Sequence, residues 1–337
     1  MEDQSNAPVA VILGTGRAVP DGILTNQDLE QMVDTSDEWI RTRTGIRQRY
    51  IADAQTATSD LATIAAQRAL DDAGVTPEEL DLILVATISP DLPFPATACL
   101  VQHNIGAVNA AAFDLSAGCS GFVYALDMAF QGIRAGNYRR ILVIGADCLS
   151  KLTNFQDRST CILFGDGAGA CVVGAQGEGM GIIASSLGAD GSGVDKLWIR
   201  AGGTRHPASP ETVAAGWHFI EMAGHDVFKF AVRIMVESSR EVLAKANMEP
   251  QDIAFFIPHQ ANIRIIEAAA HRLKLKPHQV YVNVERYGNT SAASIGIALD
   301  ELARSGQLKR GQKLLLVGFG AGLTWGSLIL QWSKGEA

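Results

Sequence analysis

Short apolar runs alternate with longer amphipathic segments along the whole chain. Runs such as "LILVATIS" (82–89) and "ILVIGAD" (141–147) have the length and β-branched content of buried strands. The segment "SGFVYALDMAF" (120–130) instead places its apolar residues at helical spacing. This alternation predicts an α/β fold with a mainly parallel sheet covered by helices on both faces.

The same pattern occurs twice. "DLILVATISPD" (81–91) corresponds to "DIAFFIPHQAN" (252–262), and "RRILVIGAD" (139–147) corresponds to "GQKLLLVGFG" (311–320). The segments around Cys119 and Asn289 pair in the same order and at nearly the same spacing. The chain is therefore expected to consist of two similar α/β halves.

The boundary between the two halves is expected in the glycine-rich segment 172–181. We place the N-terminal half at residues 1–176 and the C-terminal half at residues 177–337. In a duplicated fold of this kind, the functional site is expected where the halves meet.

Cys119 lies where a short strand, expected to be buried, turns into an apolar helix. At a helix N-terminus, free backbone N–H groups and the helix dipole stabilise a thiolate, which suits a nucleophile. An ordinary buried cysteine is the alternative. The other cysteines lie in apolar stretches and are expected in the core: Cys99, Cys148, Cys161 and Cys171.

His259 and Asn289 are placed at strand ends by the repeat, as Cys119 is. Because sites in open α/β sheets gather at the carboxyl ends of strands, we expect these three side chains to meet. Asn289 also fits a plain helix N-cap. The remaining histidines have no such placement and are expected to be structural or exposed: His103, His206, His218, His225, His271 and His278.

Composition indicates a well-packed globular protein. Of 337 residues, 47% are hydrophobic and 19% charged, with a net charge of −8 and no basic block, so nucleic acid is not expected as a partner. The N-terminus lacks the features of a signal peptide, and the apolar runs are too short to span a membrane. Five cysteines at no metal-ligand spacing favour the cytoplasm and predict no metal.

Two glycine-rich stretches do not predict a nucleotide cofactor. "GTGRAVPDG" (14–22) lacks the third glycine of a dinucleotide fingerprint, and Pro20 opposes a helix there. "FGDGAGA" (164–170) lies between two strand-like runs, so its Asp166-Gly167 pair predicts a hairpin turn.

Six motifs follow one another along the chain: "DTSDEWIRTRTGIRQRYIA", "DLSAGCSGF", "ILFGDGAGA", "PHQANIRI", "YGNTSAAS" and "FGAGLTWGS". Together they resemble the β-ketoacyl-acyl-carrier-protein synthase III family of thiolase-fold condensing enzymes. The resemblance covers the chain from about Val9 to Trp332. It implies a duplicated, five-layered αβαβα architecture with mixed sheets, a homodimer, and a catalytic triad of Cys119, His259 and Asn289.

The residue types of this triad fit the activity that the resemblance implies. Cys119 can form an acyl thioester, whereas Asn289 only donates and accepts hydrogen bonds. One His and one Asn suit an enolate made by decarboxylation, which needs no base. The expected reaction condenses an acyl-CoA starter, acetyl-CoA being the expected one, with malonyl-acyl carrier protein and no further cofactor. This reaction initiates fatty acid biosynthesis.

The resemblance also implies binding residues. The backbone N–H groups of Cys119 and Ala321 form the oxyanion hole, although glycine is expected where Ala321 stands. Arg264 is the expected docking residue for acidic acyl carrier protein, on a helix that also carries Arg272, Lys274 and Lys276. Phe94, from across the dimer, and Leu149 line the acyl pocket. The coenzyme A residues are Trp39, Arg43, Arg158, Met222, Gly224, Ala261 and Asn262.

Rival functions differ in the residues that they need. Thiolases need a second cysteine near the C-terminus, and no cysteine follows Cys171. Elongating ketoacyl synthases have histidine where Asn289 stands. Chalcone-type or secondary-metabolite ketosynthases share the Cys–His–Asn set and stay open. A non-catalytic partner subunit usually lacks the nucleophile, which is present here.

Overall fold

Two mixed β-sheets and their covering helices make up the computed structural model, which describes residues 9–176 and 180–335. The strands of the first sheet lie in the order β1-β7-β6-β4-β5. They are β1 (Val9–Ala18), β4 (Leu82–Ala86), β5 (Ala111–Leu115), β6 (Arg140–Cys148) and β7 (Asp166–Gln176). The second sheet has the order β8-β13-β12-β11. Its strands are β8 (Ile182–Ala189), β11 (Phe255–Pro258), β12 (Lys313–Gly320) and β13 (Thr324–Gln331).

The two sheets have the same pairing pattern. In each, an antiparallel three-stranded unit (β1-β7-β6 or β8-β13-β12) continues into a parallel neighbour, β4 or β11. The position of β5 is taken in the second sheet by an isolated parallel bridge between Phe256 and Val280. The duplicated architecture is confirmed, but the prediction of mainly parallel sheets is wrong because each sheet is half antiparallel or more.

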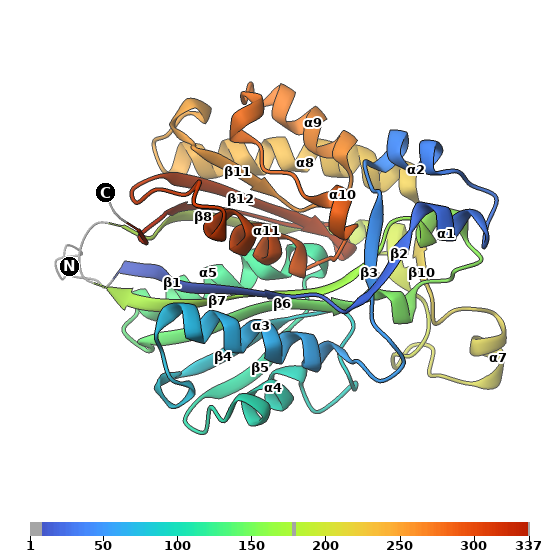
Figure 1. Ribbon diagram of the computed structural model, residues 1–337, viewed down its shortest axis with the longest axis horizontal. Coiled ribbons are helices and arrows are strands. Elements are labelled where there is room, and N and C mark those ends of the chain that lie inside the picture. Colours follow the sequence, from blue (N-terminus) through green and yellow to red (C-terminus); the bar gives the residue numbers. More distant parts are fainter. Residues whose placement is uncertain (1–8, 177–179, 336–337) are drawn as a thin grey trace.

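Helices and sheets stack in five layers (Figure 1). The central layer holds α5 and α11, the two helices between the sheets, and most of its buried side chains are apolar, as in Phe122 and Ile295. The two outer layers cover the far faces of the sheets. The main helices are α3 (Thr58–Ala73), α4 (Thr97–Ile105), α5 (Gly121–Arg134), α8 (Gly224–Lys245), α9 (Ile263–Arg272) and α11 (Ala293–Arg304).

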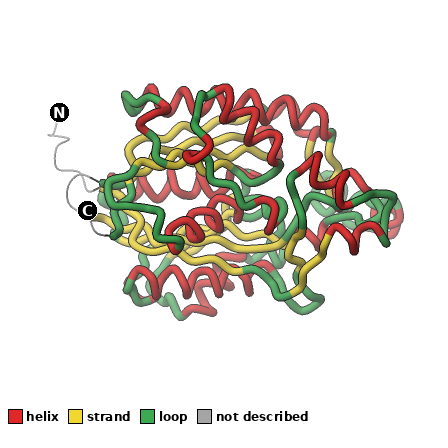
Figure 2. Tube along the Cα trace, turned by 45° about the horizontal axis from the view of Figure 1, so that its top comes forward, coloured by secondary structure: helices red, strands yellow, loops and turns green. Residues whose placement is uncertain are grey.

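Smaller elements gather at one end of the molecule, beyond the ends of the two sheets (Figures 1 and 2). One group is inserted between β1 and α3, and the other between β8 and α8. The first group is β2 (Gly22–Thr25), α1 (Asn26–Glu30), α2 (Asp37–Thr44) and β3 (Gln48–Ile51). The second includes β9 (Leu197–Ile199), α7 (Pro210–Ala214) and β10 (Ile220–Met222). The short helices α6 (Arg158–Cys161) and α10 (Val284–Tyr287) belong to the loops of the sheets.

Three local predictions fail against this fold. Asp166 and Gly167 start β7 instead of forming a hairpin turn, because the preceding "TC" belongs to α6 and "ILF" to no strand. The strand before Cys119, β5, is not buried: it is the edge of its sheet, and Phe113 is 38% exposed. Cys99 is exposed and not in the core.

The division at residues 176 and 177 stays a prediction. Gln176 ends β7, and β8 begins at Ile182, while residues 177–179 lie outside the described residues. Within the described parts of the chain, no helix is both long and apolar enough to cross a membrane.

Candidate active site

Cys119 occupies the turn between β5 and α5. The turn is a 3-10 helix, Gly118–Ser120, and α5 begins directly after it at Gly121. Gly118 has φ 54°, and a Cβ at this position would stand 2.6 Å from the backbone N of Ala321. Glycine is therefore required for the close approach of this turn to the one that follows β12.

Burial determines the ionisation of Cys119. The side chain is 6% exposed, and desolvation raises the pKa of the thiol to about 12. Burial thus opposes the stabilisation of a thiolate that is expected from the helix N-terminus. The thiol must lose its proton during the reaction.

His259 directly follows β11, where its backbone N–H donates to the Val317 carbonyl at 2.7 Å. Its ring is buried, and desolvation lowers the pKa to about 3. The imidazole is thus neutral at physiological pH. Its Nδ1 atom lies 2.7 Å from the Ser294 hydroxyl, and its ring meets the edge of Phe319 at a centroid distance of 5.2 Å.

Asn289 is held by its backbone and by its side-chain oxygen. Its N–H donates to the Leu163 carbonyl at 2.8 Å, and its carbonyl accepts from the Gly165 N–H at 3.0 Å. The side-chain Oδ1 accepts from the Ser291 N–H at 2.9 Å. Asn289 follows the short helix α10 instead of a strand, and the N-cap of α11 is Ala292, so both of these interpretations of Asn289 are wrong.

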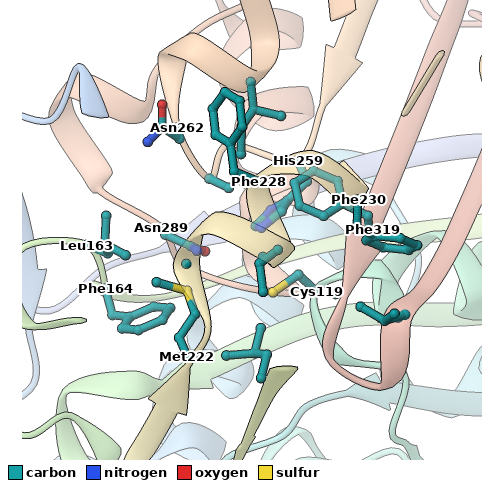
Figure 3. Close-up of a pocket in the computed structure, with 17 residues that line it drawn as sticks. Cys119, Leu163, Phe164, Met222, Phe228, Phe230, His259, Asn262, Asn289 and Phe319 are labelled. Atoms are coloured by element: carbon teal, nitrogen blue, oxygen red, sulfur yellow. The ribbon is translucent and has the colours of Figure 1, made fainter. Parts of the chain in front are cut away.

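Cys119, His259 and Asn289 line one narrow cavity of about 90 Å³, and Figure 3 shows their side chains converging on it. The rest of its wall is largely apolar, with Phe228, Phe319 and neighbouring side chains. A second cavity of about 420 Å³ also reaches Cys119 and includes Leu149. The nucleophile therefore borders two cavities, which suits a reaction with two substrates.

The comparisons with known proteins agree with this geometry. One family model, 3-oxoacyl-[acyl-carrier-protein (ACP)] synthase III, matches residues 113–191. A second, for the C-terminal part of the same synthase, matches residues 243–332. The beta-ketoacyl-[acyl-carrier-protein] synthase III of Caldanaerobacter subterraneus is 60% identical over 96% of this chain and 98% of its own. The chain belongs to this synthase III family. It is accordingly an acyl-transferring condensing enzyme.

Solved structures show the same relationship. The 3-oxoacyl-[acyl-carrier-protein] synthase III from Aquifex aeolicus superposes with a TM-score of 0.89 and is 49% identical, over 96% of this chain and all of the other. The priming β-ketosynthase of the R1128 polyketide pathway has a TM-score of 0.91 and is 37% identical, with 98% of both chains covered. The thiolase-type fold expected from the sequence is thus confirmed.

The residues expected to bind coenzyme A form two groups. The first group lines the narrow cavity and consists of Met222, Gly224, Ala261 and Asn262. The second is a cation–π cluster in which the guanidinium groups of Arg43 and Arg158 lie 5.4 and 5.0 Å from the centroid of the Trp39 ring. Asn262 joins the groups, because its Nδ2 donates to the Arg43 carbonyl at 3.0 Å.

Arg264 is exposed at the start of α9, with its guanidinium 5.8 Å from the centroid of the cavity-lining Phe228 ring. Arg272 ends the same helix, away from this position. Of the two expected acyl-pocket residues, Leu149 lines the second cavity, whereas Phe94 is 85% exposed and lines neither cavity.

Ala321 follows β12 in a 3-10 turn, Ala321–Leu323, beside Cys119. The positive φ angles of this turn belong to Gly322 (74°) and Leu323 (45°). Alanine at position 321 therefore causes no backbone strain of the kind that glycine would avoid.

Two residues in contact with His259 were not singled out from the sequence. Phe319 packs on His259 and ends a predicted strand, so the strand-end rule that selected His259 applies to it as well. Ser294 contacts His259 from another element, and no local signal marks it. Within residues 9–176 and 180–335, no group of His, Cys, Asp or Glu side chains is arranged to hold a metal ion.

Proposed function

We propose that the chain condenses an acyl-CoA with malonyl-acyl carrier protein to give 3-oxoacyl-acyl carrier protein, the first condensation of fatty acid synthesis. The observation that carries this proposal is the cavity shared by Cys119, a neutral His259 and Asn289. It offers a nucleophile and hydrogen-bond groups but no titrating base. Such a site fits decarboxylation, in which loss of carbon dioxide leaves the electron pair for the new C–C bond.

In the first stage, Cys119 attacks the thioester carbonyl of the acyl-CoA. Its proton leaves with the coenzyme A thiol, and the acyl group stays on sulfur. The backbone N–H groups of Cys119 and Ala321 hold the oxyanion of the tetrahedral intermediate. The close approach of their two turns supports this role, since a Cβ on Gly320 would stand 2.3 Å from the Cys119 nitrogen.

In the second stage, His259 and Asn289 donate hydrogen bonds to the thioester carbonyl of the malonyl group. Decarboxylation converts this carbonyl to an enolate, whose growing negative charge strengthens both bonds. The enolate carbon attacks the acyl-cysteine, and Cys119 leaves as a thiolate that regains a proton. The two donors thus serve condensation and not acylation.

The entrance to the site supports binding of both substrates. An adenine ring would stack between the Trp39 ring and a guanidinium of Arg43 or Arg158, with the pantetheine arm in the narrow cavity. Arg264 would contact the acidic carrier protein at the cavity mouth. Replacing Arg264 with Glu is expected to raise KM for the carrier-bound substrate without changing acylation by acyl-CoA.

The starter is proposed to be a short acyl group such as acetyl. The chain is proposed to act as a homodimer, in which the exposed Phe94 of one subunit closes the acyl cavity beside Leu149 of the other. A bulky ring at this place limits the chain length. The reaction needs no further cofactor, and its place is the cytoplasm, in keeping with five free cysteines.

The first test is intact-protein mass spectrometry of wild type and Cys119→Ala with acetyl-, isobutyryl- and octanoyl-CoA in separate reactions. We expect one acyl group on wild type, acetyl above all, and none on the variant. Absence of labelling by every donor would refute the proposed function. Preference for a longer donor would instead support a secondary-metabolite starter role, like that named for the R1128 ketosynthase.

The division of roles has its own test. His259→Ala and Asn289→Ala are expected to acylate Cys119 at nearly the wild-type rate and to lose about 100-fold or more in condensation. Single-turnover acylation and release of carbon dioxide from malonyl-acyl carrier protein measure the two steps. Equal losses in both steps would show that the assignment is wrong.

A further inference from the structure

The hydrogen bond between His259 and Ser294 decides what His259 can offer to a substrate. Nδ1 of the ring and Oγ of Ser294 are 2.7 Å apart, and both residues are buried. Either atom can supply the proton. If Ser294 donates, the neutral ring carries its hydrogen on Nε2; if Nδ1 donates, Nε2 keeps a bare lone pair.

The surroundings of the Ser294 hydroxyl determine the direction of this bond. The backbone N–H of Gln260 points at Ser294 Oγ at 3.4 Å, so this oxygen already faces one donor. Among the described residues, the only acceptor in hydrogen-bond contact with the hydroxyl is His259 Nδ1. If Nδ1 carried a hydrogen, Oγ would face two donors and its own buried proton would have no partner, which is costly.

We propose that Ser294 is a positioning residue that holds His259 in the tautomer with hydrogen on Nε2, so that an N–H group is directed into the cavity. Ser294 lies in the first turn of α11, a helix packed between the two sheets, so its hydroxyl is held by a rigid element. Figure 3 shows His259 among the side chains that line the cavity. Because Nδ1 is bonded to Ser294, Nε2 is the ring nitrogen left for the substrate.

Asn289 is oriented by the same segment of chain. The Ser291 N–H donates a hydrogen bond to Asn289 Oδ1 at 2.9 Å. The Nδ2 amide group is therefore left to donate to a substrate in the cavity. Ser291 has φ 49°, a conformation that few non-glycine residues adopt. The hydrogen bond from its N–H to Asn289 Oδ1 is formed in this unusual turn. Residues 289–294 thus orient both side chains as hydrogen-bond donors, one through a backbone N–H and one through the Ser294 hydroxyl.

This arrangement has a consequence for the first stage of the reaction. In a ring with hydrogen on Nε2, the only basic lone pair is on Nδ1. This lone pair accepts the hydrogen bond from Ser294, so none faces the cavity. His259 therefore does not accept the proton of Cys119 during acylation. The role of the donors in condensation rests on the proposed function, whereas the tautomer itself does not.

The tautomer is measured directly by long-range ¹H–¹⁵N correlation spectra of the full-length protein labelled with ¹⁵N-histidine. The His259→Gln variant identifies the signals of His259 by their absence. We expect the wild-type ring to show its hydrogen on Nε2 at pH 7, and Ser294→Ala to show a mixture or the Nδ1 form. A wild-type ring protonated on Nδ1 would overturn the inference, whatever the enzyme condenses.

Kinetics provide the second measurement. Ser294→Ala is expected to lower decarboxylative condensation about tenfold while acylation of Cys119 stays near the wild-type rate. Ser294→Thr keeps the hydroxyl and is expected to restore condensation. Ser239→Ala is the matched control, because Ser239 is also a buried helical serine but donates to the Met235 carbonyl, away from the site.

Two outcomes of the kinetics would contradict the inference. Equal losses of Ser294→Ala in acylation and condensation would indicate a purely structural role. Unchanged condensation in a variant whose His259 tautomer has shifted would show that the tautomer does not matter for catalysis. If the Nε2 form is found but the wild type condenses no malonyl-acyl carrier protein, the proposed function fails and the tautomer assignment stands.

Discussion

The chemistry of each site residue is set by its surroundings more than by its type. His259 is at the end of a strand, as its sequence position predicts, but its neutrality results from desolvation by the packed core around it. The same holds for Cys119, whose raised pKa opposes the expected effect of a helix N-terminus. The sequence allowed these side chains to be selected, whereas their ionisation depends on burial, which local sequence does not reveal.

Burial of His259 makes stability depend on pH. The folded pKa of His259 is about 3, below the ordinary histidine value of 6.5, so the unfolded chain binds more protons between these pH values. Stability is therefore lost as pH falls from about 6.5. Relative to His259→Gln, wild type should lose about 2 kcal/mol more in its free energy of unfolding between pH 7 and pH 5.

Urea unfolding at the two pH values measures this difference. His103→Gln is the control, because it replaces an exposed histidine by the same residue outside the active site. If His259→Gln and wild type lose the same free energy, His259 is not buried in its neutral form.

At the scale of elements, the site depends on two turns that approach each other through glycines. Gly320 at the end of β12 has φ −170°, an extended conformation open to any residue, yet a Cβ there would meet the Cys119 nitrogen at 2.3 Å. The requirement for glycine at this position is thus one of space. The apposed atoms are backbone atoms, which cannot rotate away as a side chain would.

Gly320→Ala is expected to separate the Cys119 turn from the Ala321 turn and to slow acylation about 100-fold, as misplacement by about 1 Å does in other sites. The rate of acyl transfer from acetyl-CoA in single turnovers measures this loss. Gly203→Ala is the control, since a Cβ at Gly203 would meet no atom within 4 Å. If Gly320→Ala is acylated at the wild-type rate, the close approach of the two turns is not needed for acylation.

Elements with a clear period were predictable from the sequence, and those fixed by distant contacts were not. The apolar runs that become β4, β6 and β12, and the helix after Cys119, are where their patterns place them. Asn289 was expected after a strand, because the sequence repeat aligns it with Cys119. The second half has only a bridge at Val280 in place of β5, followed by α10. The backbone of Asn289 is instead fixed by Leu163 and Gly165, far away in sequence.

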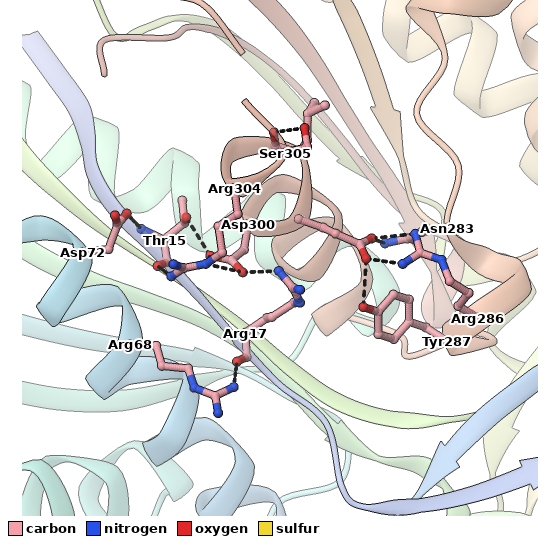
Figure 4. A network of polar contacts seen from close by, with 12 residues as sticks. Thr15, Arg17, Arg68, Asp72, Asn283, Arg286, Tyr287, Asp300, Arg304 and Ser305 are labelled. Carbon is pink, nitrogen blue, oxygen red and sulfur yellow. Dashed lines mark hydrogen bonds and ion pairs between the residues drawn. The ribbon is translucent and has the colours of Figure 1, made fainter. Parts of the chain in front are cut away.

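At the scale of the whole molecule, a polar network around the buried Asp300 carboxylate joins the two halves (Figure 4). Asp300 of α11 accepts a hydrogen bond from the Thr15 hydroxyl of β1 at 2.8 Å and pairs with Arg17 at 2.6 Å. Arg304 pairs with the same carboxylate at 2.9 Å. The Asp300 side chain is 1% exposed, whereas those of Arg17 and Arg304 are 30% and 48% exposed, so a buried negative charge is paired with two partly exposed cations.

Replacing Asp300 with Asn keeps the shape but removes the charge that faces Arg17 and Arg304. Because Arg17 and Arg304 stay partly hydrated when the charge is removed, the substitution is expected to cost about 2 kcal/mol in the free energy of unfolding, measured with urea, which is the value of lost hydrogen bonds to a charged group. Glu237→Gln is the control, because its pair with Arg233 is exposed and should contribute less than about 1 kcal/mol. Equal effects of the two substitutions would show that the junction does not depend on the Asp300 charge.

The edge of the first sheet provides the last prediction. Among the described strands, β5 pairs with β4 only, so its other edge presents free backbone groups beside the 38% exposed Phe113. An exposed apolar edge strand can pair with a strand of another molecule. In the proposed homodimer, a second copy of β5 would cover this edge. The exposed Phe94 fits the same proposal, because a ring that is 85% exposed in one subunit gains contacts if it enters the acyl cavity of the other.

Phe113→Lys should therefore raise the dissociation constant of the dimer at least about tenfold, since it places a charge in an apolar interface. Sedimentation velocity across a concentration series measures this, with Ile23→Lys as a control that replaces a more exposed apolar residue on β2. A wild-type chain that stays monomeric at micromolar concentration would contradict the dimer. In that case, Phe94 could not limit the starter, and Phe94→Ala would leave the preference among acyl-CoA donors unchanged.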